Sequence, residues 1–220
     1  MARFGTLFFD FDGTVVDTIE AIVRSVQDTF AHFDFPQPDA EEIKSYIGVP
    51  LHNYFPYLAR EYYARHDPDE VRGKYREIYA ASYGRTLVQP YAGMANLLAD
   101  LKAAGCSLGI VSSKRTEPIE MTLADTGLNG IFDAIVGSDQ VEQFKPLPQT
   151  VFLCAQRIGL EDARDALVIG DSPHDIEMGQ RAALATCGVF WGAAAEQTIR
   201  NASPDYCVAD VAALRSLLLG

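Results

Sequence analysis

The sequence predicts an α/β fold, in which a parallel β-sheet is flanked by helices and a block of helices is inserted after the first strand. Short apolar runs alternate with segments of helical periodicity from about residue 90 onward. These runs are apolar at nearly every position, as expected for strands that helices cover on both faces. Between the first run and residue 88 no further buried strand is expected, so that stretch is predicted to be helical.

The individual elements follow from the two periodicities. Strands are predicted at the apolar runs 6–9, 107–111, 132–136, 166–169 and 186–191, with a weaker one at 206–208. Helices are predicted, from apolar residues at helical spacing, at 18–33, 94–104, 117–126, 150–158, 175–183 and 211–218. Strands that alternate with helices of this length are typical of a parallel sheet with crossover connections.

The inserted helical block divides the chain into two predicted units. Residues 1–15 and 89–220 form the α/β core, and residues 16–88 form a helical cap. The block is rich in Tyr, Arg and Glu and is interrupted by prolines. The connections at 15–17 and 85–93 are the predicted hinges between the two units.

Composition limits the classes of partner. The formal net charge of −12 disfavours nucleic acid, because both surfaces are negative. It also requires that any phosphate site be made locally positive by a metal, lysines or backbone N–H groups. No apolar run approaches the roughly 20 residues of a membrane helix, and the first residues lack the pattern of a secretory signal. We therefore expect a cytoplasmic protein, a monomer or homodimer, with neither nucleic acid nor membrane as partner.

Cysteine usage agrees with this location. The four cysteines lie in apolar stretches, and no two of them have C-x-x-C spacing. A zinc site or a redox dithiol is therefore disfavoured, and buried reduced thiols are expected.

Carboxylates stand where predicted strands end. Asp10 and Asp12 follow the first apolar run, and Asp171 and Asp175 follow the fourth. Because the carboxyl ends of parallel strands meet at one edge of the sheet, these acids are expected to lie together. Four adjacent carboxylates repel unless a cation neutralises them, and hard oxygen ligands favour Mg²⁺. The alternative interpretation is helix capping, for example by Asp171 or Ser172 at the start of the following helix.

Two serines and a lysine follow other strands and reach the same predicted edge. Ser112 and Ser113 end the second apolar run and precede a helix whose N–H groups can bind an anion. Lys145, after the third run, supplies a positive charge for a phosphate. Alone, the two serines with Lys114 are better explained by a solvated turn, and Lys145 is equally explained by a loop beside a proline turn. These signals gain weight only together with the acids.

Four segments together resemble a known family. The chain is similar, in motif order and spacing and over nearly its whole length, to the phosphatases of the haloacid dehalogenase superfamily. The resemblance rests on the segments at 10–18 (DFDGTVVDT), 110–114 (IVSSK), 145–148 (KPLP) and 170–176 (GDSPHDI). The helical insertion also stands where this family has its cap, and the stretch IGVPL at 47–51 is similar to that of phosphoglycolate phosphatases and related pyrophosphatases. The implied fold is a Rossmann-like parallel-sheet core with an inserted α-helical cap.

The resemblance implies catalytic and metal-binding roles. Asp10 would be the nucleophile that forms an aspartyl-phosphate, and Asp12 would act as general acid and then as general base. Asp10, the backbone carbonyl of Asp12 and Asp171 would bind Mg²⁺. Asp175 would contribute to the metal site directly or through water.

The resemblance also implies the contacts to the substrate. Ser112 and Lys145 would hold the transferring phosphoryl group, which makes them catalytic as well as phosphate-binding. The further residues expected at the phosphate or substrate are Gly13, Thr14, Ser113 and Gly48. His52, which lies close to the turn at 48–50 of the predicted cap, is an additional candidate for a substrate contact.

Asp12 narrows the reaction that the resemblance implies. Dehalogenases, phosphonate hydrolases and ion-pumping ATPases of the superfamily lack an acid at this second position, so a phosphatase or phosphomutase is implied. The leading expectation is a hydrolase of a small phosphomonoester such as phosphoglycolate. An inorganic pyrophosphatase and a sugar phosphomutase similar to β-phosphoglucomutase are the alternatives. A non-catalytic binding module is disfavoured because the site residues are intact.

Two positions depart from the family pattern. Ser113 stands where many relatives have Asn, and Gln149 stands where many have an acid. Neither substitution removes an expected catalytic or metal-binding group, so the departures bear on fine phosphate positioning and on the subfamily.

Overall fold

The computed structural model of the protein describes residues 2–160 and 165–220. Residue 1 and residues 161–164, which belong to the predicted core, lie outside the described residues. The centre of the fold is a six-stranded sheet in the order β5-β4-β1-β6-β7-β8, with all neighbours parallel. The strands are β1 (Thr6–Phe9), β4 (Ser107–Val111), β5 (Ala134–Val136), β6 (Ala166–Gly170), β7 (Ala185–Val189) and β8 (Tyr206–Val208). The predicted α/β class is confirmed.

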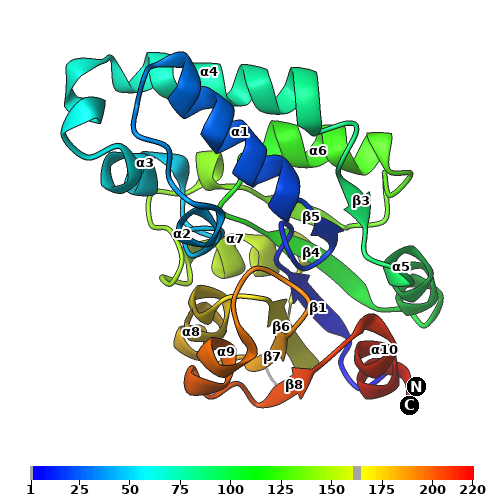
Figure 1. The fold of residues 1–220 in the computed structure, drawn as a ribbon. Coiled ribbons are helices and arrows are strands. Elements are labelled where there is room, and N and C mark those ends of the chain that lie inside the picture. Colours follow the sequence, from blue (N-terminus) through cyan, green and yellow to red (C-terminus); the bar gives the residue numbers. More distant parts are fainter. Residues whose placement is uncertain (1, 161–164) are drawn as a thin grey trace.

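Both faces of the sheet are covered by helices (Figure 1). Successive side chains of a strand point to opposite faces, so Leu7 and Phe9 of β1 pack in one apolar cluster and Phe8 packs in the other. The first cluster includes helices α5 (Met94–Ala103) and α10 (Val211–Leu219), and the second includes α7 (Gln149–Ile158) and α8 (Pro173–Arg181). Burying each of these side chains contributes about 2–3 kcal/mol, which explains why the strands read as unbroken apolar runs.

A helical insertion leaves the sheet after β1 and returns before α5. It begins and ends in a short antiparallel ribbon, in which β2 (Val16–Asp17) pairs with β3 (Gln89–Pro90). Between them lie α1 (Ile19–His32), α2 (Ala40–Lys44), α3 (Leu51–Ala59), a 3-10 segment (Arg60–Arg65), α4 (Pro68–Ile78) and a π-helical turn (Tyr79–Tyr83). Figure 1 shows α1 to α4 as a group on the side of the sheet toward which β1 runs. The interior of the insertion is aromatic: Phe55 makes edge-to-face contacts with Phe30 and with Tyr75.

The remaining elements are α6 (Thr116–Asp125), a short 3-10 turn (Ser138–Gln140) and α9 (Glu196–Asn201). The sequence did not predict α9, whose only buried residue is Ile199. The strand predicted at 132–136 begins at Ala134. Asp133, just before it, donates its N–H to the carbonyl of Leu108 and accepts the N–H of Leu108 on its carboxylate, both at 2.7 Å. Among the described residues, no helix combines the length and apolar character that a membrane crossing requires.

Candidate active site

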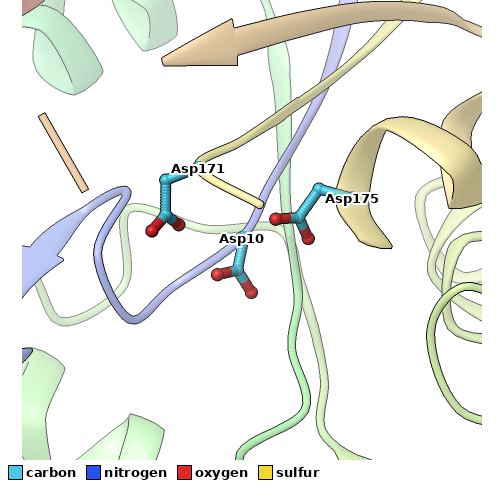
Figure 2. Close-up of side chains that lie close together, drawn as sticks. All are labelled: Asp10, Asp171 and Asp175. Atoms are coloured by element: carbon cyan, nitrogen blue, oxygen red, sulfur yellow. The ribbon is translucent and has the colours of Figure 1, made fainter. Parts of the chain in front are cut away.

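Three carboxylates converge at the carboxyl ends of the strands (Figure 2). Asp10 follows β1, Asp171 follows β6, and Asp175 lies in the first turn of α8. All three side chains are buried, and one oxygen from each lies within 4.8 Å of the others. The topology therefore brings together acids that are up to 165 positions apart in the chain (175 − 10).

Local packing fixes the carboxylate of Asp171. Its Oδ1 accepts the hydroxyl of Thr14 at 2.8 Å, and its Oδ2 accepts the N–H of Ala193 at 2.8 Å. Gly13 and Gly192 press against the same side chain, because a Cβ on either would lie 2.4 Å or 2.2 Å from Asp171 Oδ2. Only glycine permits so close an approach at these two positions.

Asp175 has two functions at the start of α8. Ser172 is the N-cap residue, its hydroxyl bonds to the carboxylate of Asp175, and the backbone N–H of Ser172 donates to the same carboxylate at 3.0 Å. This capping box satisfies N–H groups that a helix start leaves unpaired. The capping alternative is thus correct for Ser172, while Asp171 is not the cap, and Asp175 still faces the other two acids.

Lys145 bridges two of the three acids. Its ammonium lies 2.6 Å from Asp10 Oδ1 and 2.5 Å from Asp175 Oδ1, and all three groups are buried. The peptide bond from Lys145 to Pro146 is cis. The segment before Lys145 is held by Gln149, whose side-chain carbonyl accepts the N–H groups of Glu142 and Gln143 at 3.0 and 2.6 Å. The amide of Gln149 thus supplies the acceptor that holds this segment.

The electrostatics of this cluster favour a bound cation. Burial raises the pKa of Asp10 well above its usual value, Lys145 opposes this, and Asp175 and Asp171 add to it. Burial and the charge of Asp175 raise the pKa of Asp171 to about 7. Burial opposes the charge of Lys145, but Asp10 and Asp175 outweigh this, so the pKa of Lys145 is raised. Three buried carboxylates around one lysine leave negative charge uncompensated, and their oxygen donors fit a hard divalent cation such as Mg²⁺.

Asp12 belongs to a second polar group beside this cluster. Its carboxylate does not join the three acids but accepts the ammonium of Lys114 at 2.8 Å, and Lys114 also donates to the hydroxyl of Tyr79 at 3.1 Å. Tyr79 comes from the helical insertion, so this chain of contacts joins the sheet to the insertion. The predicted metal contact of Asp12 was through its backbone carbonyl, and the side-chain geometry does not test it.

A cavity of about 520 Å³ opens above these groups. Asp10, Asp12, Ser112 and Ser113 line its floor, and the insertion contributes Gly48 and His52 among its wall residues. Of the predicted phosphate contacts, Gly13, Thr14 and Lys145 are not among the lining residues. Thr14 is fully buried and uses its hydroxyl on Asp171, and Lys145 is buried and paired with Asp10 and Asp175. Ser113 Oγ is buried without a hydrogen-bond partner among the described residues.

Sequence reasoning missed several cavity residues. The insertion also places Arg72, Arg76 and Tyr79 on the wall, and the core adds Arg115 next to Lys114. Only the position of Lys114, immediately after the two serines, carried a signal in the sequence. The arginines of α4 carried no such signal, because nothing local indicates which side of the insertion meets the sheet.

The sequence model described as Haloacid dehalogenase-like hydrolase matches residues 7–189, a range that contains every residue of the three-acid cluster. The chain belongs to this family. The match also spans Lys145, Lys114 and the whole helical insertion, so the insertion falls within the part of the chain that the family shares.

Known relatives extend over nearly the whole chain. A protein of Bacillus velezensis named pyrophosphatase PpaX is 35% identical and covers 93% of this chain and 91% of its own length. The PpaX protein of Listeria monocytogenes is 33% identical, with 97% of this chain and 95% of its own length covered. A solved structure of a predicted phosphatase from Clostridium acetobutylicum superimposes with a TM-score of 0.82 at 28% identity, over 97% of each chain.

A second solved structure shares the fold. A predicted phosphoglycolate phosphatase from Haemophilus somnus superimposes with a TM-score of 0.86 at 24% identity, over 99% of each chain. At this identity the likeness shows the architecture alone. Together the comparisons support a phosphatase of the haloacid dehalogenase-like family and leave its substrate to be argued from the site.

Proposed function

We propose that this protein is a Mg²⁺-dependent phosphohydrolase that acts on a small phosphorylated metabolite through an aspartyl-phosphate on Asp10. One observation carries the proposal: the side chain of Asp10 lies at the floor of an open cavity, beside Lys145 and two further buried acids. A buried carboxylate at that position reaches a phosphorus atom that enters the cavity, while the surrounding positive groups offset the charge of the phosphate.

The first step is transfer of the phosphoryl group to the enzyme. A carboxylate oxygen of Asp10 attacks phosphorus, the bond from phosphorus to the leaving oxygen breaks, and Asp12 gives that oxygen a proton. In the second step water attacks the aspartyl-phosphate, Asp12 accepts a proton from this water, and Asp10 is released with inorganic phosphate. Asp12 thereby returns to its starting state, so one water molecule is consumed for each substrate.

The other residues of the site hold the reacting groups. Lys145 and Ser112 are proposed to bind the phosphoryl oxygens, and Lys114 orients Asp12. Asp10, the backbone carbonyl of Asp12, and Asp171 would hold Mg²⁺, with Asp175 beside them. When bound, the ion supplies charge neutralisation for the phosphate and lets the carboxylates stay ionised.

The helical insertion is proposed to act as a cap that excludes bulk water and selects the substrate. Its Gly48 turn lies against the core, because a Cβ on Gly48 would lie 3.5 Å from Ser172 Oγ. In this proposal the division into a core at 1–15 and 89–220 and a cap at 16–88 describes two units that move about the ribbon of β2 and β3. We further propose a cytoplasmic location, which the four free cysteines support.

The mechanism is tested with p-nitrophenyl phosphate. The wild-type protein should release p-nitrophenol with Mg²⁺ and not with a chelator, and Asp10→Asn should abolish turnover. Acid quenching during turnover should trap an acyl-phosphate on Asp10 in the wild-type protein. Undiminished turnover by Asp10→Asn would exclude the mechanism.

Pyrophosphate hydrolysis is a second candidate within the same chemistry. The observation that favours it is the 35% identity to a protein named pyrophosphatase over 93% of this chain. Comparing kcat/KM for pyrophosphate and phosphoglycolate separates the two substrate classes. Conversion of glucose 1-phosphate to glucose 6-phosphate, without net release of phosphate, would instead identify the phosphomutase alternative.

A further inference from the structure

We propose that Arg76, Arg115 and Arg72 form a second anion-binding subsite in the cavity, and that the substrate therefore carries a second anionic group besides the phosphoryl group that is transferred. This inference rests on the proposed function, because the subsite would bind the part of the substrate that leaves. The chemistry of the second group is that of an oxyanion, either a carboxylate or a phosphate.

The three arginines reach the same cavity from two sides. Arg72 and Arg76 are four residues apart on α4 of the insertion, so they lie on one face of that helix, whereas Arg115 is the N-cap residue of α6 in the core. Burial lowers the pKa of Arg76, and the charges of Arg115 and Arg72 lower it further. Because all three arginines line one cavity, an anion held among them would offset the repulsion between their charges.

The state of pairing differs among these arginines. Arg72 donates to Asp69 at 2.6 Å and to the hydroxyl of Tyr63 at 3.0 Å, so it is fixed in place. Neither Arg76 nor Arg115 has a carboxylate within 4 Å among the described residues. The guanidinium groups of Arg76 and Arg115 therefore have N–H donors free for an oxyanion on the cavity wall.

Three of the carboxylates on the same lining, Asp10, Asp12 and Asp69, are paired with cations other than Arg76 and Arg115. Asp12 is paired with Lys114 and Asp69 with Arg72, whereas Asp139 accepts the N–H and the hydroxyl of Thr116 at 2.7 and 3.0 Å and keeps its negative charge. Asp139 and Glu117 are the lining carboxylates without a cationic partner within 4 Å among the described residues, and Arg76 and Arg115 are the lining guanidinium groups without a carboxylate at that distance.

Two further groups of the lining suit an oxyanion. Ser113 Oγ is buried without a partner among the described residues, between Ser112 and Lys114 in the chain. His52, from α3, also faces the cavity, and burial followed by the charge of Arg72 lowers its pKa. Neutral His52 can still donate one hydrogen bond. The lining thus offers donors at the floor for the transferred phosphoryl group and a separate set on the wall.

The test compares substrates that differ in their leaving group. p-Nitrophenyl phosphate has an uncharged leaving group before cleavage, phosphoglycolate carries a carboxylate, and pyrophosphate carries a second phosphate. Arg76→Gln and Arg115→Gln should each lower kcat/KM by about tenfold for phosphoglycolate or pyrophosphate, the substrates with two anionic groups. The kcat/KM for p-nitrophenyl phosphate should change far less. Whichever of phosphoglycolate and pyrophosphate loses more identifies the second group.

Lys74→Gln is the matched control, because Lys74 lies between the two arginines on α4 but pairs with Glu77 at 2.7 Å and does not line the cavity. It removes one positive charge from the same helix and should leave all three kcat/KM values unchanged. Equal losses for all three substrates in Arg76→Gln and Arg115→Gln, or no loss at all, would overturn the subsite.

A binding measurement separates failure of the subsite from failure of the proposed function. Calorimetry on the wild-type protein with Mg²⁺ should show that methylenediphosphonate or phosphonoacetate, neither of which carries a P–O–C or P–O–P bond to cleave, binds at least tenfold more tightly than methylphosphonate. Arg76→Gln should remove most of this preference. If the protein turns over no phosphoester, the proposed function is rejected, and the calorimetry still tests the subsite. Equal affinity for the three phosphonates would reject the subsite.

Discussion

The Lys114 ammonium lies 2.8 Å from Asp12 Oδ1, and both side chains are only 13% exposed. Burial opposes the charge of Lys114, but Asp12 and the neighbouring tyrosines outweigh it, so the pKa of Lys114 is raised. The same ammonium contacts Tyr79 of the insertion and lies 4.5 Å from the centre of its ring. The orientation of Asp12 is therefore coupled to the position of the insertion.

Lys114→Met should lower kcat for p-nitrophenyl phosphate by about tenfold or more, because Asp12 loses the partner that orients it for proton transfer. KM should change less, and Lys114→Arg should recover part of the loss. Tyr79→Phe removes only one acceptor of Lys114 and should cost about two- to threefold. Steady-state kinetics on the four proteins decides this. An unchanged kcat in Lys114→Met would show that Asp12 needs no such support.

Replacing Lys145 should affect stability as well as catalysis. Lys145→Met leaves Asp10 and Asp175 buried without their shared cation, and should destabilise the metal-free protein by about 3 kcal/mol. Millimolar Mg²⁺ should restore part of this loss. Urea unfolding followed by the fluorescence of Trp191, the only tryptophan, measures it. The control is Lys102→Met, whose pair with Asp133 is 35% and 38% exposed and should contribute less than about 1 kcal/mol. Equal losses of unfolding free energy in Lys145→Met and Lys102→Met would contradict the expectation that unpaired buried carboxylates destabilise the protein.

The metal-free protein should lose stability as pH rises. The pKa of Asp171 is raised to about 7 from an ordinary value of 3.8, and that of Asp10 is also raised. Between these values the folded state holds protons that the unfolded chain has released, so the free energy of unfolding falls as pH increases. Mg²⁺ binds the ionised acids and should therefore raise Tm more at about pH 8 than at about pH 5.

Thermal unfolding with Mg²⁺ and with chelator, at both pH values, tests this expectation. Asp171→Asn, which removes one of the titrating groups, should flatten the pH dependence of the metal-free protein. A Mg²⁺ effect on Tm that is the same at both pH values would show that the acids are already ionised without metal.

Gly192→Ala should weaken Mg²⁺ binding without altering a ligand. The added Cβ would lie 2.2 Å from Asp171 Oδ2, so the carboxylate has to move, and the Mg²⁺ concentration for half-maximal activity should rise about tenfold. Gly73→Ala is the control, because Gly73 lies within α4 with nothing within 4 Å of its added Cβ. It should stabilise the protein by about 0.5–1 kcal/mol and leave the Mg²⁺ requirement unchanged. A normal Mg²⁺ requirement in Gly192→Ala would show that Asp171 is free to adjust.

The floor of the site was predictable because it depends on topology. Each apolar run ends at a known residue, and parallel strands align their carboxyl ends, so Asp10 and Asp171 had to become neighbours once the alternation of strands and helices was recognised. The same reasoning located β1, β4 and β8 at the predicted boundaries. Lys145 was expected at that edge from its place after the third apolar run.

The walls of the cavity were not predictable in this way. Whether Arg76 faces the cavity or solvent depends on how α4 packs against α1 and on where the ribbon of β2 and β3 directs the insertion, and neither is encoded locally. The hydroxyl of Thr14 shows the same limit: the family resemblance implied a phosphate contact, but in the structure this hydroxyl donates to Asp171. Substrate selectivity resides in these tertiary relationships.

The ribbon that joins Val16 to Pro90 has an evolutionary consequence. Both passages of the chain into and out of the helices occur at directly paired residues, about 5 Å apart. A turn of two to five residues would therefore join the two ends if the whole helical segment were excised. One helical segment can thus be replaced by another, of different length and sequence, at this ribbon without moving the acids at the strand ends. Such replacement offers a route by which the same catalytic residues come to act on new metabolites.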